Sequence, residues 1–188
     1  MRLFVAIELT QEVRKNVASL LNEFRVLSPH TKWIRPDSMH LTLKFLGETD
    51  SSRLSEIKAA LAFIHSPSRI TLKFQCLGFF PNSNRPHVFW VGIEPSSNLR
   101  AIVGELDQSL HRLGVPTEDR EFRPHITLAR LNSSSLSPAL RLAVSKNMTA
   151  TFGSFATDQF HLIESKLKST GAEYTTLQSF SFVSEARR

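Results

Sequence analysis

Two short stretches decide the fold: MHLTLKFLGE at residues 39–48 and RPHITLARL at residues 123–131. Each stretch contains the pattern His-x-Thr-x, with His40 in the first and His125 in the second. The two histidines are 85 residues apart. Both stretches are rich in apolar and β-branched residues, which favours strands. We therefore expect two strands that match one another from distant parts of the chain.

Strand geometry separates the polar from the apolar residues of both motifs. Successive side chains of a strand point to opposite faces. This alternation places His40, Thr42 and Lys44 on one face of the first strand, and His125 and Thr127 on one face of the second. The apolar side chains between them point to the opposite faces, where they can be buried. Each strand is thus expected to present an imidazole beside a hydroxyl.

The rest of the chain arranges itself around these strands as a repeat. Apolar stripes at helical spacing predict helices, and alternating or wholly apolar runs predict strands. The helices are expected over 11–27, 54–64 and 99–113, with a less regular one over 136–144 that contains Pro138; the strands are expected over 2–9, 40–46, 70–78, 88–93, 125–130, part of 151–163, and 174–182.

After the first strand, the order helix, strand, helix, strand, strand occurs over 11–93 and again over 98–182. The only local sequence echo that we find between these halves lies on the two histidine strands. A duplicated unit predicts an α+β fold with two similar lobes about a pseudo-twofold axis and a central cleft. The alternative is that the same order recurs by accident in a mixed α+β domain.

Composition restricts the class of protein. The chain has 188 residues, of which 41% are hydrophobic and 21% charged, so collagen-like and disordered classes are excluded. No apolar run approaches the roughly 18 residues that cross a bilayer, and MRLFVAIELT at the start is interpreted as a strand and not as a signal peptide. A single cysteine, Cys76, is expected to be a small buried hydrophobe. These features favour a cytoplasmic protein in a reducing compartment.

Charge and motif content point to a polyanionic partner without a metal. Lys and Arg number 23 against 17 Asp and Glu, which gives a net charge of +6 and an isoelectric point near 9.9. Such a surplus favours nucleic acids or phosphorylated metabolites. The sequence has neither an HExxH motif nor a pair of cysteines. We therefore expect no metal and no cofactor.

Paired imidazoles and hydroxyls suit one kind of chemistry. With an ordinary pKa near 6.5, one histidine can accept a proton from water while the other donates a proton to a leaving oxygen. The hydroxyls of Thr42 and Thr127 can donate hydrogen bonds to the non-bridging oxygens of a phosphate. A phosphodiester with adjacent attacking and leaving positions is the substrate that this set of groups predicts.

The chain resembles a known family over nearly its whole length. MRLFVAIEL at 1–9, HLTLKFLGE at 40–48, FRPHITLAR at 122–130 and TGAEYTTLQSF at 170–180 are similar to the RNA 2′,3′-cyclic phosphodiesterase family. That family is also called the 2′-5′ RNA ligase family and belongs to the 2H phosphoesterase superfamily.

The resemblance implies that residues 1–188 form a single two-lobed domain with two antiparallel sheets and a positively charged cleft. It implies hydrolysis of RNA 2′,3′-cyclic phosphate ends to 2′-phosphates, on RNA ends or nucleotides. His40 would donate a proton to the departing 3′ oxygen, His125 would activate water, and Thr42 and Thr127 would hold the phosphate. We expect a monomer with no membrane association.

Three neighbouring residues are further candidates for substrate binding. Arg130 ends the second motif, but strict alternation turns it away from His125, so the strand must twist or end there for Arg130 to contact a phosphate. Lys44 is expected on the face of His40, either attracting substrate or simply solvated. Phe4, which shares a strand face with Arg2, is either a platform for a base or part of the core.

The remaining motifs leave alternatives open. Five other histidines, His30, His65, His87, His111 and His161, have no matching hydroxyl and are expected to be structural or at the surface. The segment 81–87 has the residues of a hairpin loop and carries Arg85, which either reaches a nucleic acid or only connects two strands. Two other functions remain possible in principle: a nucleotide- or RNA-binding module without turnover, and 2′-5′ ligation as the reverse reaction.

Overall fold

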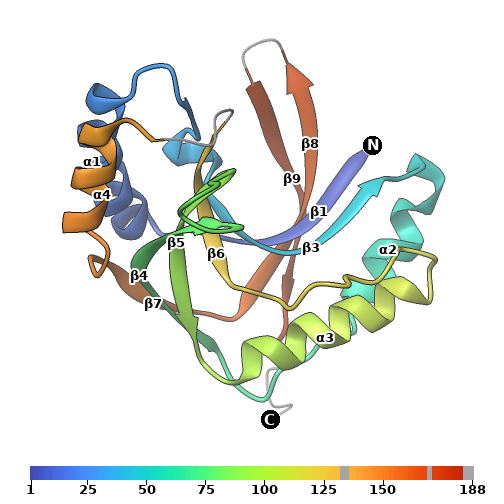
Figure 1. Cartoon of the computed structure of the whole chain (residues 1–188). Helices are drawn as coiled ribbons and strands as arrows, with labels where there is room; N and C mark the ends of the chain where they lie inside the picture. The colour runs from blue at the N-terminus through green and yellow to red at the C-terminus, as the bar shows by residue number, and fades with distance from the viewer. Residues whose placement is uncertain (132–135, 169–170, 184–188) are drawn as a thin grey trace.

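A computed structural model describes residues 1–131, 136–168 and 171–183. The element order alternates strands and helices much as the sequence predicts (Figure 1). The elements are β1 (Arg2–Glu8), α1 (Gln11–Leu27), β2 (Lys32–Trp33), a 3₁₀ turn (Pro36–Ser38), β3 (His40–Glu48), a second 3₁₀ turn (Ser51–Arg53), α2 (Leu54–Leu61), β4 (Ile70–Phe80), β5 (Val88–Pro95), α3 (Asn98–His111), β6 (His125–Arg130), α4 (Pro138–Lys146), β7 (Thr151–Thr157), β8 (Gln159–Lys168) and β9 (Gly171–Ser181).

The strands form two antiparallel sheets, one in each lobe. The first sheet has the order β3-β1-β8-β9 and the second has the order β2-β6-β5-β4-β7. Helices α2 and α3 cover the first sheet, and α1 and α4 cover the second (Figure 1). This is the bilobal α+β fold that the sequence predicts.

The two lobes exchange elements between the two halves of the chain. The first sheet combines β1 and β3 with β8 and β9 from the end of the chain, and the second sheet combines β2, β4 and β5 from the first half with β6 and β7 from the second. Each histidine strand occupies a corresponding place, because β3 pairs with β1 and β6 pairs with β5. The lobes are therefore similar, but neither is made from one half alone.

Most predicted elements are present, and the differences have local causes. The run at 151–163 divides at Asp158 into β7 and β8. Helix α4 begins at Pro138, where proline is tolerated because the first helical N–H needs no partner. Thr10 caps α1, since its hydroxyl accepts a hydrogen bond from the Val13 N–H at 3.4 Å. The segment 81–87 connects the antiparallel pair β4 and β5, as a hairpin loop does.

The prediction that Cys76 is buried is wrong. Its side chain is exposed, although it lies in the middle of β4. The pairing of β4 with β5 skips Cys76, and its φ of 63° is that of a left-handed residue. A bulge therefore turns this side chain out of the alternation.

One hydrophobic cluster draws on the inner faces of both sheets and on all four helices. It contains the apolar residues of both motifs, among them Leu41 and Leu43 from β3 and Ile126 and Leu128 from β6. A separate small cluster of Phe4, Ala6 and Ile163 lies on the other face of the first sheet. Among the described residues, the model contains no helix with both the length and the apolar character needed to span a membrane.

Candidate active site

Both histidine strands carry the same irregularity. The pairing of β3 with β1 skips Leu43, and the pairing of β6 with β5 skips Leu128. Each skipped residue lies three positions after its histidine, and a bulge there reverses the faces of the residues that follow. As a result the side chains five positions after each histidine, Phe45 and Arg130, are exposed and line the same cavity as the imidazoles.

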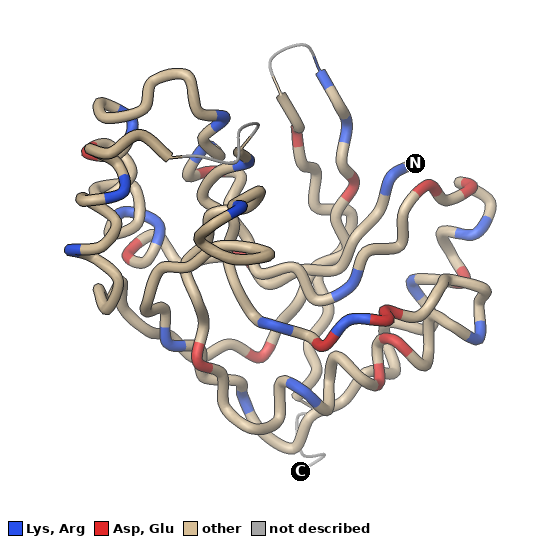
Figure 2. Tube along the Cα trace, viewed as in Figure 1, with Lys and Arg blue, Asp and Glu red and all other residues tan. Residues whose placement is uncertain are grey.

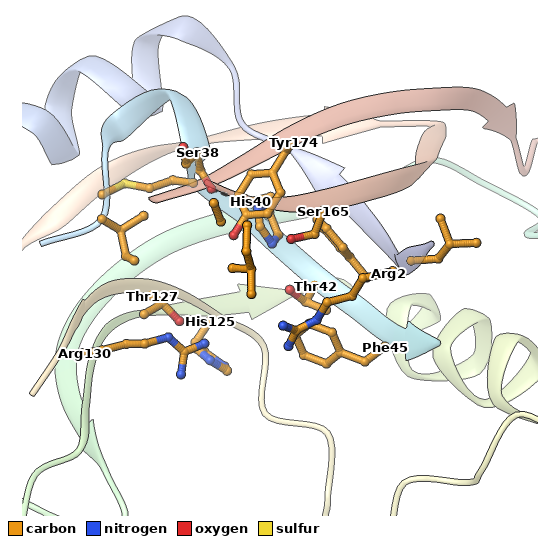
Figure 3. A pocket seen from close by; sticks show the side chains of 16 residues that line it. Arg2, Ser38, His40, Thr42, Phe45, His125, Thr127, Arg130, Ser165 and Tyr174 are labelled. Atoms are coloured by element: carbon orange, nitrogen blue, oxygen red, sulfur yellow. Dashed lines mark hydrogen bonds between the residues drawn. The ribbon is translucent and has the colours of Figure 1, made fainter. Parts of the chain in front are cut away.

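The site is a cavity of about 310 Å³ between the two sheets (Figure 3). Its wall includes both imidazoles, both threonine hydroxyls and two guanidinium groups, and none of the described residues in it is Asp or Glu. The lining residues are Arg2, Leu3, Phe4, Ile34, Ser38, Met39, His40, Thr42, Phe45, His125, Thr127, Arg130, Ser165, Leu167, Ala172 and Tyr174.

The His40 imidazole is held between a backbone carbonyl and two aromatic rings. Its Nδ1 lies 3.0 Å from the Ser38 carbonyl oxygen. The ring stacks on Phe4, with centroids 4.7 Å apart and planes at 30°, and meets the edge of Tyr174 at 5.1 Å. Burial lowers the pKa of His40 to about 4, against the opposing effects of the Ser38 carbonyl and the Glu8 carboxylate.

The His125 imidazole is held in a corresponding way by the other lobe. Its Nδ1 lies 2.7 Å from the Arg123 carbonyl oxygen, and the edge of its ring meets Phe80 at 4.9 Å between centroids. Trp90 lies behind it at 6.4 Å. Burial lowers the pKa of His125, and the positive charge of Arg130 lowers it further, while the Arg123 carbonyl opposes both.

These contacts fix which nitrogen of each ring is available for chemistry. A carbonyl oxygen only accepts hydrogen bonds, so Nδ1 of His40 and of His125 must carry the hydrogen. In a neutral ring Nε2 is then the unprotonated nitrogen, with a lone pair that can take a proton. Both rings are therefore prepared for proton transfer through Nε2.

Six of the seven predicted site residues line this one cavity, and only Lys44 does not. His40, Thr42, His125 and Thr127 line one cavity. Arg130 lines it as well, because the bulge at Leu128 supplies the departure from alternation that its participation requires.

The prediction that Lys44 shares the face of His40 is wrong. The bulge at Leu43 turns Lys44 inward, where its side chain is 2% exposed. The ammonium lies 2.5 Å from Asp107 Oδ1 and donates to the Pro116 carbonyl at 2.6 Å. Its charge is neutralised in the interior and does not reach the cavity that holds the imidazoles.

Phe4 belongs to the small cluster behind His40 and also lines the cavity. Its side chain is 3% exposed and packs under His40 with Ala6 and Ile163, which is the core role considered for it. Phe45, by contrast, is 53% exposed at the rim of the cavity. Phe45 is thus an exposed ring in the wall that the first lobe contributes, where Tyr174 is half-buried.

Sequence reasoning did not single out Arg2, Tyr174 and Ser165 as site residues, although all three line the cavity (Figure 3). A second sequence similarity between the two halves was also overlooked. LFVAIE at 3–8 matches FWVGIE at 89–94, so the histidine strands are not the only echo between the halves. This second echo aligns Phe4, which supports His40, with Trp90, which lies behind His125.

Two glycines give Trp90 its place behind His125. A Cβ atom built on Gly78 would overlap the indole ring, and one on Gly92 would lie 3.2 Å from it. These neighbours on β4 and β5 leave the ring room to lie across the sheet. The position of Trp90 therefore depends on the absence of side chains at both sites.

A second cavity of about 1130 Å³ adjoins the first and shares Thr42, Phe45 and His125 with it. Of the five histidines outside the two motifs, only His87 lines it, and none lines the first cavity. Arg85 belongs to the lining of neither. Basic residues occur over both lobes and are mixed with acidic ones (Figure 2), so the positive charge of the first cavity comes from Arg2 and Arg130.

Comparison with known proteins identifies the family. The family model LigT like Phosphoesterase matches residues 7–90 and again residues 91–174, which confirms the predicted repeat. An RNA 2′,3′-cyclic phosphodiesterase of Methanocaldococcus jannaschii is 33% identical over 96% of this chain and 100% of its own. One of Thermus thermophilus is 35% identical over 100% of this chain and 93% of its own.

Solved structures agree in fold. Escherichia coli LigT complexed with 3′-AMP matches with a TM-score of 0.78 and 27% identity, over 96% of this chain and 97% of that chain. Protein TT0787 of Thermus thermophilus matches with a TM-score of 0.77 and 30% identity, over 97% and 98% of the two chains. The protein therefore belongs to the family of LigT-like phosphoesterases, as the paired His-x-Thr-x motifs predict.

Proposed function

We propose that this protein hydrolyses RNA 2′,3′-cyclic phosphate ends to 2′-phosphates by general acid and base catalysis, without a metal ion. One observation carries the proposal: two imidazoles, each with Nδ1 bound to a carbonyl, line one cavity with two threonine hydroxyls and two arginines. Relatives that match nearly the whole chain are named as RNA 2′,3′-cyclic phosphodiesterases, which supports the same reaction.

The cavity is suited to bind the anionic phosphate of such an end. Thr42 and Thr127 can each donate a hydroxyl hydrogen bond to a non-bridging oxygen. The guanidinium of Arg130 can stabilise the negative charge that grows as phosphorus becomes five-coordinate. Within the part of the chain that the structure describes, no carboxylate lines the cavity to repel the phosphate. Arg2 faces the site from the opposite lobe and adds a second positive charge (Figure 3).

The two imidazoles divide the proton transfers. A neutral ring takes a proton from water as the water oxygen forms its bond to phosphorus, and a protonated ring gives its proton to the 3′ oxygen as the bond from phosphorus to that oxygen breaks. The products are a 2′-phosphate and a 3′-hydroxyl. We assign His40 as the donor and His125 as the acceptor, as the family resemblance implies.

Protonation of the donor depends on the substrate. Burial lowers the pKa of both rings, so both are neutral near pH 7. A phosphate anion within a few ångströms stabilises an imidazolium and raises its pKa. Binding of the cyclic phosphate thereby supplies the protonated ring that the reaction requires.

The base of the terminal nucleotide is expected to stack on Phe45. This ring is exposed at the boundary between the two cavities. Stacking of a base on an aromatic side chain stabilises binding by about 1 to 3 kcal/mol. Lys44 and Phe4, which the sequence also suggests, line the second and the first cavity respectively, but both side chains are almost fully buried, so we expect neither to contact the base.

Metal independence follows from the same chemistry, because the imidazoles supply both proton transfers. Among the residues that the structure describes, no three His, Cys, Asp or Glu side chains are grouped as metal ligands would be. The test is incubation of an oligoribonucleotide carrying a 2′,3′-cyclic phosphate with the protein in EDTA. We expect a product with a 2′-phosphate; no turnover, or turnover only with added metal, would overturn the proposal.

The same assay separates catalysis from simple binding. His40→Asn and His125→Asn are each expected to lower the rate by about 10² to 10⁴, while His65→Asn, at an exposed site outside both cavities, should retain it. Tight binding by the parent protein without turnover, unchanged in both variants, would instead indicate a binding module.

A further inference from the structure

Each histidine strand is reached by a segment that crosses from one lobe to the other. Helix α1 covers the second sheet, and residues 28–39 lead from it to β3 in the first sheet (Figure 1). Helix α3 covers the first sheet, and residues 112–124 lead to β6 in the second. The carbonyl that holds each imidazole lies at the end of its crossing segment. The way these segments are fixed therefore determines how the imidazoles are oriented.

Arg14 fixes the end of the first crossing segment. It lies on α1 with a side chain 23% exposed. Its Nη1 donates to the Pro36 carbonyl at 3.1 Å and its Nη2 donates to the Leu9 carbonyl at 3.3 Å. Leu9 follows the end of β1, and Pro36 begins the 3₁₀ turn before β3. One guanidinium thus ties together the two chain segments next to His40.

The turn transmits this tie to the imidazole. The Pro36 carbonyl, which accepts from Arg14, also accepts the Met39 N–H at 3.1 Å. Within the same turn the Ser38 carbonyl accepts from Nδ1 of His40. A displacement of the Pro36 carbonyl therefore displaces the group that orients the ring.

The charge of Arg14 also acts on His40. It contributes to the lowering of the His40 pKa, after burial, while Glu8 on β1 opposes it. Tyr174 on β9 meets the ring edge, and Arg2 on β1 lines the same cavity. Among the described groups that act on this imidazole, Arg14 is the positive one outside the cavity, and its Nη1 lies 4.0 Å from Asp37 Oδ1.

We propose that Arg14 is a positioning residue for His40, which it holds in its reactive orientation through the 3₁₀ turn at 36–38. The inference rests on the proposed function, in which the His40 imidazole transfers a proton. Arg14 lines neither cavity, so it acts through the turn and not by contact with substrate.

A matched control exists on the same helix. Arg25 is half-buried like Arg14, and its Nη2 donates to the Ile34 carbonyl of the same crossing segment at 3.1 Å. Its bond lies before the turn, so Arg25→Gln removes a comparable tether without releasing the Ser38 carbonyl. The test compares Arg14→Gln, Arg14→Lys and Arg25→Gln.

Turnover of the cyclic phosphate and the NMR titration of both active-site imidazoles are measured in each variant. Arg14→Gln should lower kcat by about 10- to 100-fold, as a misplaced reacting group does, with a smaller change in KM. The titration of His40, and the limb of the pH profile that it controls, should move to higher pH, while His125 is unchanged. Arg14→Lys should keep the titration near that of the parent and recover only part of kcat.

The outcomes separate the possible roles. If Arg14→Gln and Arg25→Gln lower kcat equally and leave the titration of His40 unchanged, Arg14 only stabilises the fold and the inference is overturned. If Arg14→Gln does not fold, the conservative variant Arg14→Lys replaces it. A kcat of Arg14→Lys below that of the parent then supports the inference, and a kcat equal to that of the parent overturns it. Absence of turnover in the parent would refute the proposed function alone, because the titration of His40 still tests its link to Arg14.

Discussion

The depressed pKa of His40 makes the stability of the fold depend on pH. In the unfolded chain the imidazole has an ordinary pKa near 6.5, whereas in the folded protein the pKa is about 4. Between these values the unfolded chain binds more protons than the folded one, so the free energy of unfolding falls as the pH falls from 6.5 towards 4. The difference in pKa corresponds to about 3 kcal/mol of stability that is present at pH 7 and absent below pH 4.

Urea unfolding at a series of pH values between 4 and 7 measures this term. His40→Gln should remove it, so the free energy of unfolding of the variant should fall less steeply with pH than that of the parent. Carboxylates also titrate in this range, but they are common to both proteins and cancel in the difference. His65→Gln, at an exposed position, should keep the slope of the parent. Parallel curves for the parent and His40→Gln would refute the burial argument for this imidazole.

Three further predictions concern groups around the site. Lys44→Met should destabilise the protein by about 3 to 5 kcal/mol in urea unfolding, because it leaves the Asp107 carboxylate without its buried partner, and Lys44→Met combined with Asp107→Leu should recover much of that loss. Arg130→Gln should lower kcat/KM by about 10², and Arg130→Lys, which keeps the charge without the planar fork, should recover part of it in the same cyclic-phosphate assay. Gly78→Ala should displace the Trp90 ring, which a change in its fluorescence and a reduced kcat would reveal, whereas unchanged fluorescence would contradict the packing argument.

The fold and the central pair of histidines were predictable because their signals are strong. Helical stripes predicted α1, α2 and α3 close to their observed bounds. The motif pairs His40 with Thr42 and His125 with Thr127 recur at matching places in a repeat, and the repeat places both in one cavity. The duplication strengthens this prediction, because the same pair of residue types at matching places in both halves is improbable by chance.

The residues that strict alternation places on the wrong strand face share one physical cause. Lys44, Cys76 and Arg130 were each placed by strict alternation, and each lies at or just after a bulge. A bulge adds one residue to a strand and reverses every following face. Nothing in the residue types around Leu43 or Leu128 marks such an insertion, because both neighbourhoods are ordinary strand sequence. Only the partner strand, far away in the chain, reveals the skipped residue.

The exchange of strands between the two lobes could not be predicted from the sequence for a similar reason. A repeat of element types predicts two equivalent halves, but it does not say which sheet each strand joins. The pairing of β8 with β1 and of β6 with β5 is settled by which apolar faces can be buried together, and this is a property of the whole core. The sequence pattern thus predicts that there are two lobes, but it does not predict which strands form the sheet of each lobe.

The bulge that both histidine strands share also explains how a duplicated site can bind its substrate in one orientation. Both lobes hold an imidazole by Nδ1 and place a threonine hydroxyl beside it, so these groups alone would bind a phosphate equally well in two orientations. The bulge brings the residue five positions after each histidine into the cavity, and there the halves differ: Phe45 in one lobe and Arg130 in the other. A ring favours a base and a guanidinium favours a phosphate. Under the proposed function, the difference at this one pair of positions orients the nucleotide in a site whose proton-transfer groups are nearly symmetric.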